Sequence, residues 1–241
     1  MPPPPWLMLV ADRGFFGGDE AWLEALERIA TAIVVVSSAK DAETIAAEGP
    51  GDAPGNAAQR LGRLPGILIQ LRTKELTGQR REQLMTAGLA RARAAGVPVF
   101  LNGPEAEARR LGFDGVHWPE SSIPRGRTSS GDGTFVRSAA VHSAAAVGRA
   151  EAAGADLAVF GPVFTSGPKL GVGTGALAAV VRQTSLPVLA IGGVDATRVA
   201  ACLGVGAAGV AVVSAVFAAG VDSGAALGAL CRALRAAAAP A

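Results

Sequence analysis

Two short apolar stretches near the end of the chain decide the fold. They read Pro187-Val-Leu-Ala-Ile191, followed by Gly192-Gly193, and Gly209-Val-Ala-Val-Val213, followed by Ser214. Continuous apolar runs of this length are typical of strands buried on both faces of a parallel sheet. Each run ends in a small-residue turn, and the loops after strands 7 and 8 of an α/β barrel commonly bind phosphate through backbone N–H groups. The pattern predicts a barrel with a phosphate-binding rim at these turns.

Six further strand candidates precede these two stretches, and Ala-, Leu- and Arg-rich helical segments such as 80–95 and 143–153 separate several of them. The strand candidates cover 6–12, 66–72, 97–102, 115–118, 134–140 and 156–160. Eight short strands with helices between them favour a closed barrel over an open sheet. The expected fold class is therefore α/β, a single (β/α)8 TIM barrel formed by one domain, 1–241.

Several segments depart from the simple repeat. We interpret 1–5 as an extended N-terminal lead, 38–64 as an elaborated first crossover and 225–241 as an Ala-rich terminal helix and tail. The run 32–37 also has the composition of a strand, which leaves a shifted strand count open. The polar Gly/Ser-rich loop 125–133 is expected to be mobile, and closure over the site is left open.

The composition excludes several classes of partner. The 241 residues carry 22 Lys and Arg against 20 Asp and Glu, and Tyr is absent, so we expect neither nucleic acid nor a membrane as partner. No basic n-region precedes an apolar segment at the start, and a cytoplasmic location is expected. Cys202 and Cys231 lack metal-ligand spacing and are interpreted as buried small hydrophobes in a reducing compartment. A homo-oligomer is left open.

Candidate site residues follow the strands, because barrel sites lie at the carboxyl ends of strands. Alternation directs Gln70, Arg72 and Lys74 to one side, a donor-rich trio suited to an anion, although an exposed basic strand end is the alternative. Asn102 ends the third strand, and Lys169 lies in the Gly-rich loop 161–175. All of these residues are predicted on the same rim.

The chain has two histidines, and their positions predict different roles. His142 follows the fifth strand, where its imidazole is suited to proton transfer near neutral pH. His117 lies within a strand and is interpreted as a core or supporting residue. No cluster of His and Cys has the spacing of metal ligands, and no metal site is predicted.

Short motifs spread over most of the chain resemble, in order and spacing, the motifs of a known protein family. They are Leu9-Val-Ala-Asp-Arg13, Ile69-Gln-Leu-Arg-Thr-Lys74, Leu101-Asn102, Gly115-Val-His117, Ala140-Val-His142, Gly154-Ala-Asp156, Phe160-Gly-Pro-Val-Phe164, Ile191-Gly-Gly193 and Val212-Val-Ser214. In order and spacing, the chain resembles the thiamine-phosphate synthase and thiazole tautomerase family. The resemblance implies a barrel that acts on a phosphorylated thiazole. It also implies phosphate contacts from four residues: Gly192, Gly193, Val213 and Ser214.

The resemblance departs from the synthases at their metal ligands. Those enzymes join an aminopyrimidine pyrophosphate to the thiazole phosphate, with Mg²⁺ on the leaving pyrophosphate. Gly103 stands in place of one metal-binding aspartate of the family and Ser122 in place of the other, while Ala140 replaces a serine. Glu120 is a single carboxylate, which makes a poor Mg²⁺ site beside pyrophosphate.

The retained residues resemble those of the tautomerase branch, which shifts a proton on a thiazole carboxylate phosphate and needs no cofactor. The resemblance implies that His142 is the catalytic acid and base. Lys169, Arg72 or Lys74 would hold the substrate carboxylate, and Lys169 is included among the catalytic candidates. Two alternatives remain: a synthase that uses Mg²⁺, and a non-catalytic barrel that binds or regulates a phosphometabolite.

Overall fold

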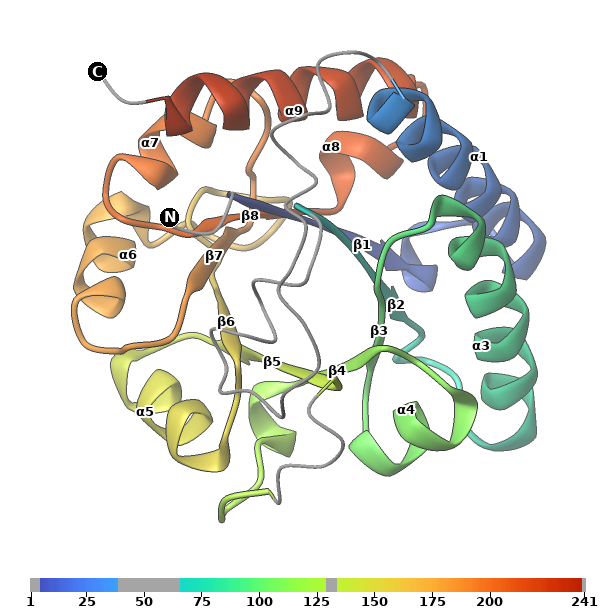
Figure 1. Cartoon of the computed structure of the whole chain (residues 1–241), viewed down its shortest axis with the longest axis horizontal. Helices are drawn as coiled ribbons and strands as arrows, with labels where there is room; N and C mark the ends of the chain where they lie inside the picture. Colours follow the sequence, from blue (N-terminus) through green and yellow to red (C-terminus); the bar gives the residue numbers. More distant parts are fainter. Residues whose placement is uncertain (1–4, 39–65, 129–133, 240–241) are drawn as a thin grey trace.

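Eight strands of the described residues pair in sequence order and close into a parallel barrel. The computed structural model describes residues 5–38, 66–128 and 134–239. Closure is made by β1, which pairs with β2 through Leu7 and Ile67 and with β8 through Leu7 and Val210. Helices surround the strands in Figure 1. The predicted (β/α)8 TIM barrel is confirmed.

The strand bounds lie within two residues of the predicted ones. The strands are β1 (Trp6–Asp12), β2 (Ile67–Arg72), β3 (Val99–Asn102), β4 (Gly115–Trp118), β5 (Val136–Val141), β6 (Leu157–Phe160), β7 (Val188–Ile191) and β8 (Gly209–Val212). The α-helices are α1 (Asp19–Ser38), α3 (Gly78–Ala92), α4 (Glu105–Leu111), α5 (Ala144–Ala153), α6 (Gly173–Val181), α7 (Val199–Leu203), α8 (Ser214–Phe217) and α9 (Ser223–Ala238). None of these helices combines the length and apolar character needed to cross a bilayer.

Alternation along each strand divides the core into two regions. Side chains such as Leu7 and Leu9 point outward and pack in the large cluster under the helices. Trp6, Met8 and Phe100 belong to a separate cluster inside the barrel. Gly115 makes room for the Phe100 ring, because a Cβ atom there would lie 2.8 Å from it. The amino-terminal part of the barrel interior is therefore packed with apolar side chains.

The prediction that left 32–37 open as a strand is wrong, because these residues form the last turns of α1. The buried side chains of α1 recur at helical spacing, from Trp22 through Leu26 and Ile29 to Ile33. The Trp22 indole N–H also donates to the carbonyl of Ala11 on β1 at 3.1 Å. Packing of this face against the barrel outweighs the strand propensity of the β-branched run.

Parts of the segments that departed from the repeat lie outside the described residues: 1–4, 39–64, 129–133 and 240–241. Ser38, predicted to open the first crossover, is the last residue of α1. The terminal helix α9 begins at Ser223, two residues before the predicted start, because Asp222 caps it by accepting from the N–H groups of Gly224 and Ala225. The division into these segments stays a prediction.

Candidate active site

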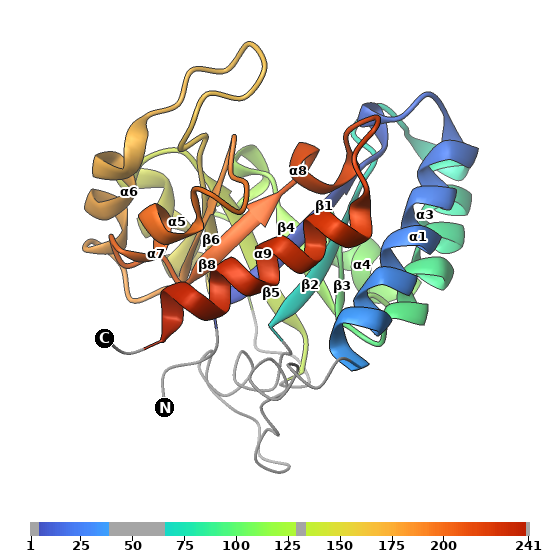
Figure 2. The same cartoon turned by 90° about the horizontal axis from the view of Figure 1, so that it is seen from above.

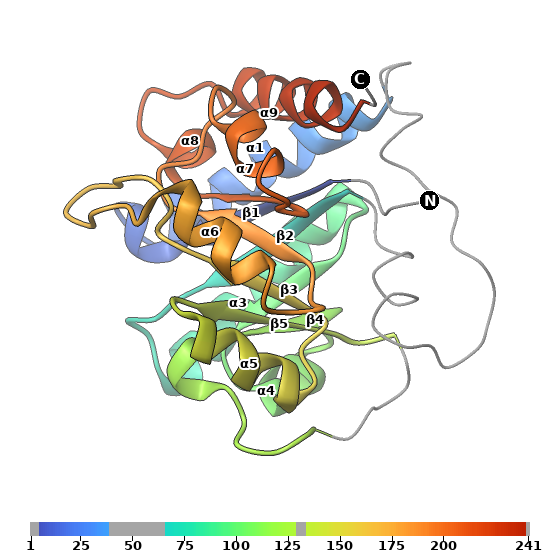
Figure 3. The same ribbon diagram turned by 90° about the vertical axis from the view of Figure 1, so that its left-hand side faces the viewer.

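A cavity of about 350 Å³ opens at the carboxyl ends of the strands. Loop 161–172 between β6 and α6 projects beyond the barrel at this end, at the top of Figure 2 and on the left of Figure 3. The predicted site residues that line the cavity are Gln70, Arg72, Lys74, Asn102, His142, Lys169, Gly192 and Val213. Gly193 and Ser214 directly follow two of them in the chain but do not line it.

One side of the cavity is cationic. Asp12 and Arg72 stand opposite each other where β1 and β2 end, and their side chains form an ion pair. The pKa of the Lys74 ammonium lies below its ordinary value because of the charge of Arg72, then burial, then the charge of Lys169. Like charges that repel one another in this way favour binding of an anionic group between them.

The cavity floor carries several buried polar side chains. Gln70 is 3% exposed and Asn102 9%, and His117 lies beside them on β4 at 4%. Burial, with a smaller contribution from the charge of Arg72, lowers the pKa of His117 to about 3. His117 Nδ1 lies 2.8 Å from Ser138 Oγ. The interpretation of His117 as a buried supporting residue is consistent with this geometry, and its ring is neutral at physiological pH.

A carboxylate and an imidazole meet at the β4 and β5 ends. Glu120 lies in a 3₁₀ turn (Glu120–Ser122) just after β4, and His142 follows β5. Glu120 Oε2 lies 2.6 Å from His142 Nδ1 and also accepts from the His142 backbone N–H at 3.0 Å. Arg149 on α5 donates to the other oxygen, Oε1, at 2.9 Å. These contacts place the His142 imidazole at the predicted end of the barrel.

The glycine turn after β7 is tightly packed against the β6–α6 loop. Phe164 donates its backbone N–H to the Gly192 carbonyl at 2.9 Å. Gly192 has φ of +96°, and a Cβ atom there would lie 2.5 Å from Pro162 Cα. Ser166 and Lys169 exchange backbone hydrogen bonds at 3.0 and 3.2 Å, which fixes the turn that carries the Lys169 side chain. Glycine at position 192 is required by both backbone conformation and space.

The carboxylates of the cavity do not suit Mg²⁺, the cation that the synthase reaction implies. Both carboxylates that line it, Asp12 and Glu120, are engaged by guanidinium or imidazole groups. Gly103 and Ser122 offer no carboxylate at the two family positions. Within the described ranges, no group of three or more His, Cys, Asp and Glu could hold a metal ion. Magnesium bound between protein and pyrophosphate normally requires free carboxylate oxygens.

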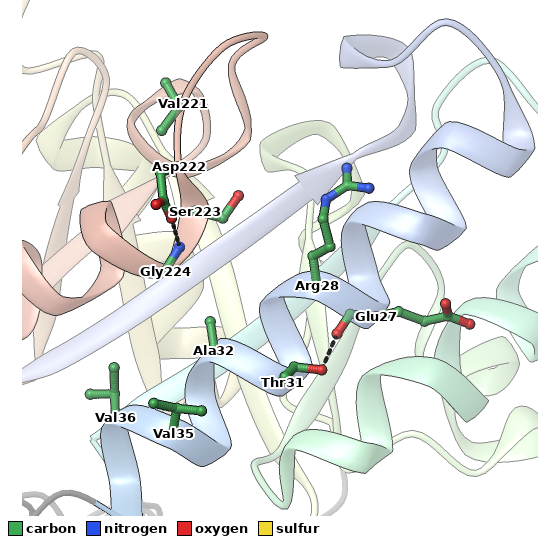
Figure 4. A pocket seen from close by; sticks show the side chains of 10 residues that line it. All are labelled: Glu27, Arg28, Thr31, Ala32, Val35, Val36, Val221, Asp222, Ser223 and Gly224. Carbon is green, nitrogen blue, oxygen red and sulfur yellow. Dashed lines mark hydrogen bonds between the residues drawn. The ribbon is translucent and has the colours of Figure 1, made fainter.

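A second hollow lies on the outside of the barrel between α1 and the start of α9 (Figure 4). Thr31 donates to the Glu27 carbonyl at 3.0 Å inside it, and Val35 is 64% exposed at its edge. None of the predicted site residues lines this hollow. It also lacks the convergent cations of the barrel mouth, so the carboxyl-end cavity is the candidate active site.

Two charged residues that line the cavity, Asp12 and Glu120, were not predicted from the sequence in the roles that the structure indicates. Asp12 ends β1, and the rule that places sites at strand ends could have singled it out. From the sequence, Glu120 was considered only as a metal ligand. Its contact with His142 was not predicted, because the two residues lie 22 positions apart in the chain. The loop residues Pro162 and Ser166 also line the cavity, and no sequence signal distinguished them from the rest of the Gly-rich segment.

Comparisons with known proteins identify the family of this chain. A sequence model of the family described as "Thiamine monophosphate synthase" matches residues 61–216 of this chain. The chain therefore belongs to the thiamine monophosphate synthase family. It is 33% identical over 148 residues to a thiamine-phosphate synthase of Bacillus velezensis and 39% identical over 149 residues to one of Methanoculleus marisnigri. These matches cover 58% of this chain and 66% and 69% of the two relatives.

A solved structure, thiamine phosphate pyrophosphorylase from Pyrococcus furiosus, superposes with a TM-score of 0.69. The superposition covers 98% of each chain at 21% sequence identity. At this identity the likeness establishes the fold and carries no further functional weight. The family assignment therefore rests on the sequence match and agrees with the resemblance found in the sequence motifs.

Proposed function

We propose that the protein catalyses a metal-independent proton shift on a thiazole carboxylate phosphate, the reaction of a thiazole tautomerase. The observation that carries this proposal is the hydrogen bond of 2.6 Å between His142 and Glu120 in a cavity that also holds cationic side chains. The same contact engages the carboxylate that a metal would require. A proton-transfer group therefore shares the cavity with groups that suit an anion, and no cofactor is proposed.

Substrate binding in this proposal uses two anionic groups of one small molecule. The phosphate would accept hydrogen bonds from backbone N–H groups at the turns 192–193 and 213–214. The carboxylate would lie near Arg72, Lys74 and Lys169, whose charges stabilise negative charge that develops when the ring loses a proton. Asn102 and Gln70 on the floor would orient the ring through their amide groups.

In this proposal, the His142 imidazole transfers the proton. It takes a proton from one ring position and returns it at another, which aromatises the thiazole without a net change in composition. General acid and base catalysis of this kind contributes about 10²–10⁴-fold to rate. The Glu120 carboxylate beside the ring offsets the positive charge that His142 carries between the two transfers.

A second candidate is the synthase reaction, and the names of the relatives favour it. Both quoted relatives are thiamine-phosphate synthases. This candidate requires Mg²⁺ beside the aminopyrimidine pyrophosphate. It would therefore need carboxylate ligands other than Gly103 and Ser122, or release of Asp12 or Glu120 from the partners described above.

A side-by-side assay on the full chain tests the two candidates. One arm follows interconversion of thiazole carboxylate phosphate tautomers with EDTA present. The other arm follows pyrophosphate release from aminopyrimidine pyrophosphate and thiazole phosphate with and without Mg²⁺. We expect turnover in the first arm alone. Magnesium-dependent pyrophosphate release with no tautomer interconversion would replace the proposal with the second candidate, and binding without turnover in either arm would indicate a non-catalytic barrel.

A further inference from the structure

We propose that Glu120 is a positioning residue that fixes the tautomer and orientation of the His142 imidazole. The inference rests on the proposed function, in which His142 transfers the proton. It goes beyond that function because it assigns a separate role to a residue that does not itself take the proton. The consequence is that Nε2, the ring nitrogen away from the carboxylate, carries the lone pair that accepts a proton.

The hydrogen-bond geometry determines which ring nitrogen carries hydrogen. An ionised carboxylate can only accept hydrogen bonds, so the contact of 2.6 Å requires His142 Nδ1 to donate to Glu120 Oε2. The neutral ring is then protonated at Nδ1 and unprotonated at Nε2. Among the described residues, no hydrogen bond to Nε2 is found, which leaves this nitrogen for substrate.

The carboxylate is itself held in place by two contacts besides the one to the imidazole ring. Its Oε2 also accepts the His142 backbone N–H at 3.0 Å, and its Oε1 accepts from Arg149 at 2.9 Å. The three contacts join the turn after β4 to the end of β5 and to α5. A carboxylate fixed in this way can restrict an imidazole that is otherwise free to rotate, since the His142 side chain is 60% exposed.

Glu120 remains ionised near neutral pH. Burial opposes ionisation, but the hydrogen bonds from His142 and Arg149 outweigh it and hold the pKa of this carboxyl below its ordinary value. The negative charge therefore persists while the imidazole gains and loses its proton.

Nitrogen-15 NMR of the full chain, labelled at histidine, tests the tautomer directly. The sequence has two histidines, so the His142→Asn variant assigns both signals. At alkaline pH, we expect the neutral His142 ring of the unaltered protein to be protonated mainly at Nδ1. Glu120→Ala should move the hydrogen mainly to Nε2, whereas Glu120→Gln should retain the Nδ1 form because its amide oxygen still accepts. An unchanged tautomer in Glu120→Ala would overturn the proposal.

Kinetics of the same variants separate positioning from substrate contact. Glu120→Ala should lower kcat about 10-fold to 100-fold, by analogy with metal-ligating histidines that lose an outer hydrogen-bond partner, and leave KM within about threefold. Glu120→Gln should recover part of kcat, and Arg149→Gln should retain the tautomer. A rise in KM at constant kcat would overturn the proposal, since it would show that Glu120 contacts substrate.

Failure of the proposed function would be recognised separately. If the unaltered protein turns over no thiazole carboxylate phosphate, the tautomerase assignment fails. The NMR comparison still tests whether Glu120 fixes the His142 ring, because it needs no substrate. Thermal unfolding of each variant, compared with the unaltered protein, excludes loss of the fold as the cause of a changed signal.

Discussion

The two ends of the barrel interior are built from the same strands, but only the carboxyl end carries polar and charged side chains around a cavity. Toward the amino ends, Leu68 and Phe100 are fully buried in an apolar cluster. Two residues further along the same strands, the polar side chains of Gln70 and Asn102 line the cavity. Two residues in a strand span about 6.6 Å. The barrel interior therefore changes from a packed apolar cluster to a cavity with polar side chains within one layer of side chains. Substitutions at the two ends should therefore affect different properties.

The largest effect is expected at the cavity end. His142→Asn should lower turnover of thiazole carboxylate phosphate about 10²–10⁴-fold, because the imidazole is proposed to move the proton. The side chain is 60% exposed, so unfolding free energy should change by about 1 kcal/mol or less. Steady-state assays and chemical denaturation measure the two quantities. An unchanged rate would remove the assigned role, and Glu82→Gln on an exposed helix face serves as the control.

The opposite pattern is expected at the packed end. Phe100→Ala removes a fully buried ring and should cost about 3–5 kcal/mol of unfolding free energy. The kcat of the protein that remains folded should stay within about twofold, because Phe100 does not line the cavity. Phe100→Leu, which leaves a smaller void, should lie between the two proteins in stability. A loss of kcat as large as that of His142→Asn would contradict the separation of the two ends.

A smaller, combined effect is expected at the turn after β7. Gly192→Ala places a Cβ atom 2.5 Å from Pro162 Cα at φ of +96°, and the backbone strain alone costs about 1–2 kcal/mol. Displacement of the turn should also raise KM, since its N–H groups are proposed to bind phosphate. Gly175→Ala is a matched control in α6, because its Cβ would meet nothing within 4 Å. Equal KM values for the two variants would argue against phosphate binding at this turn.

The smallest effect is a shift in pH dependence. The pKa of Lys74 is lowered by the charge of Arg72, by burial and by the charge of Lys169. Lys74 thus loses its proton at a lower pH than an ordinary lysine, and affinity for the anionic substrate should fall as pH rises through that range. Arg72→Gln removes the largest cause of the lowered Lys74 pKa. In this variant, the loss of affinity at alkaline pH, called the alkaline limb of the pH profile, should move to higher pH.

Measurement of KM against pH for the unaltered protein, Arg72→Gln and Lys74→Gln tests this expectation. Loss of the positive charge at position 74 should abolish the alkaline limb in Lys74→Gln. An alkaline limb that stays at the same pH in Arg72→Gln would show that another group causes it. Arg72→Gln should also raise KM at every pH, because one cation of the cavity is lost.

Much of the site could be predicted because barrel topology converts chain position into spatial position. Gln70, Arg72 and Lys74 alternate along one strand end, and all three line the cavity. The turn at Gly192 could be located from its glycines and the strand before it. The prediction was wrong where propensity competed with packing: 32–37 is rich in β-branched residues, yet it is helical because α1 buries Ile29 and Ile33.

The sequence by itself predicted an eight-stranded barrel, the end of the barrel where the candidate site lies, and the family, although it left a shifted strand count open. The strand pattern and the end of the barrel follow from local apolar runs and glycine positions, whereas the family follows from the resemblance of short sequence motifs. Only the tertiary structure decided which charges pair. The Asp12–Arg72 contact spans 60 positions and the Glu120–His142 contact spans 22, and each depends on how neighbouring strand ends and turns come together. The local sequence pattern does not predict such pairs, because the strand ends come together only when the barrel closes.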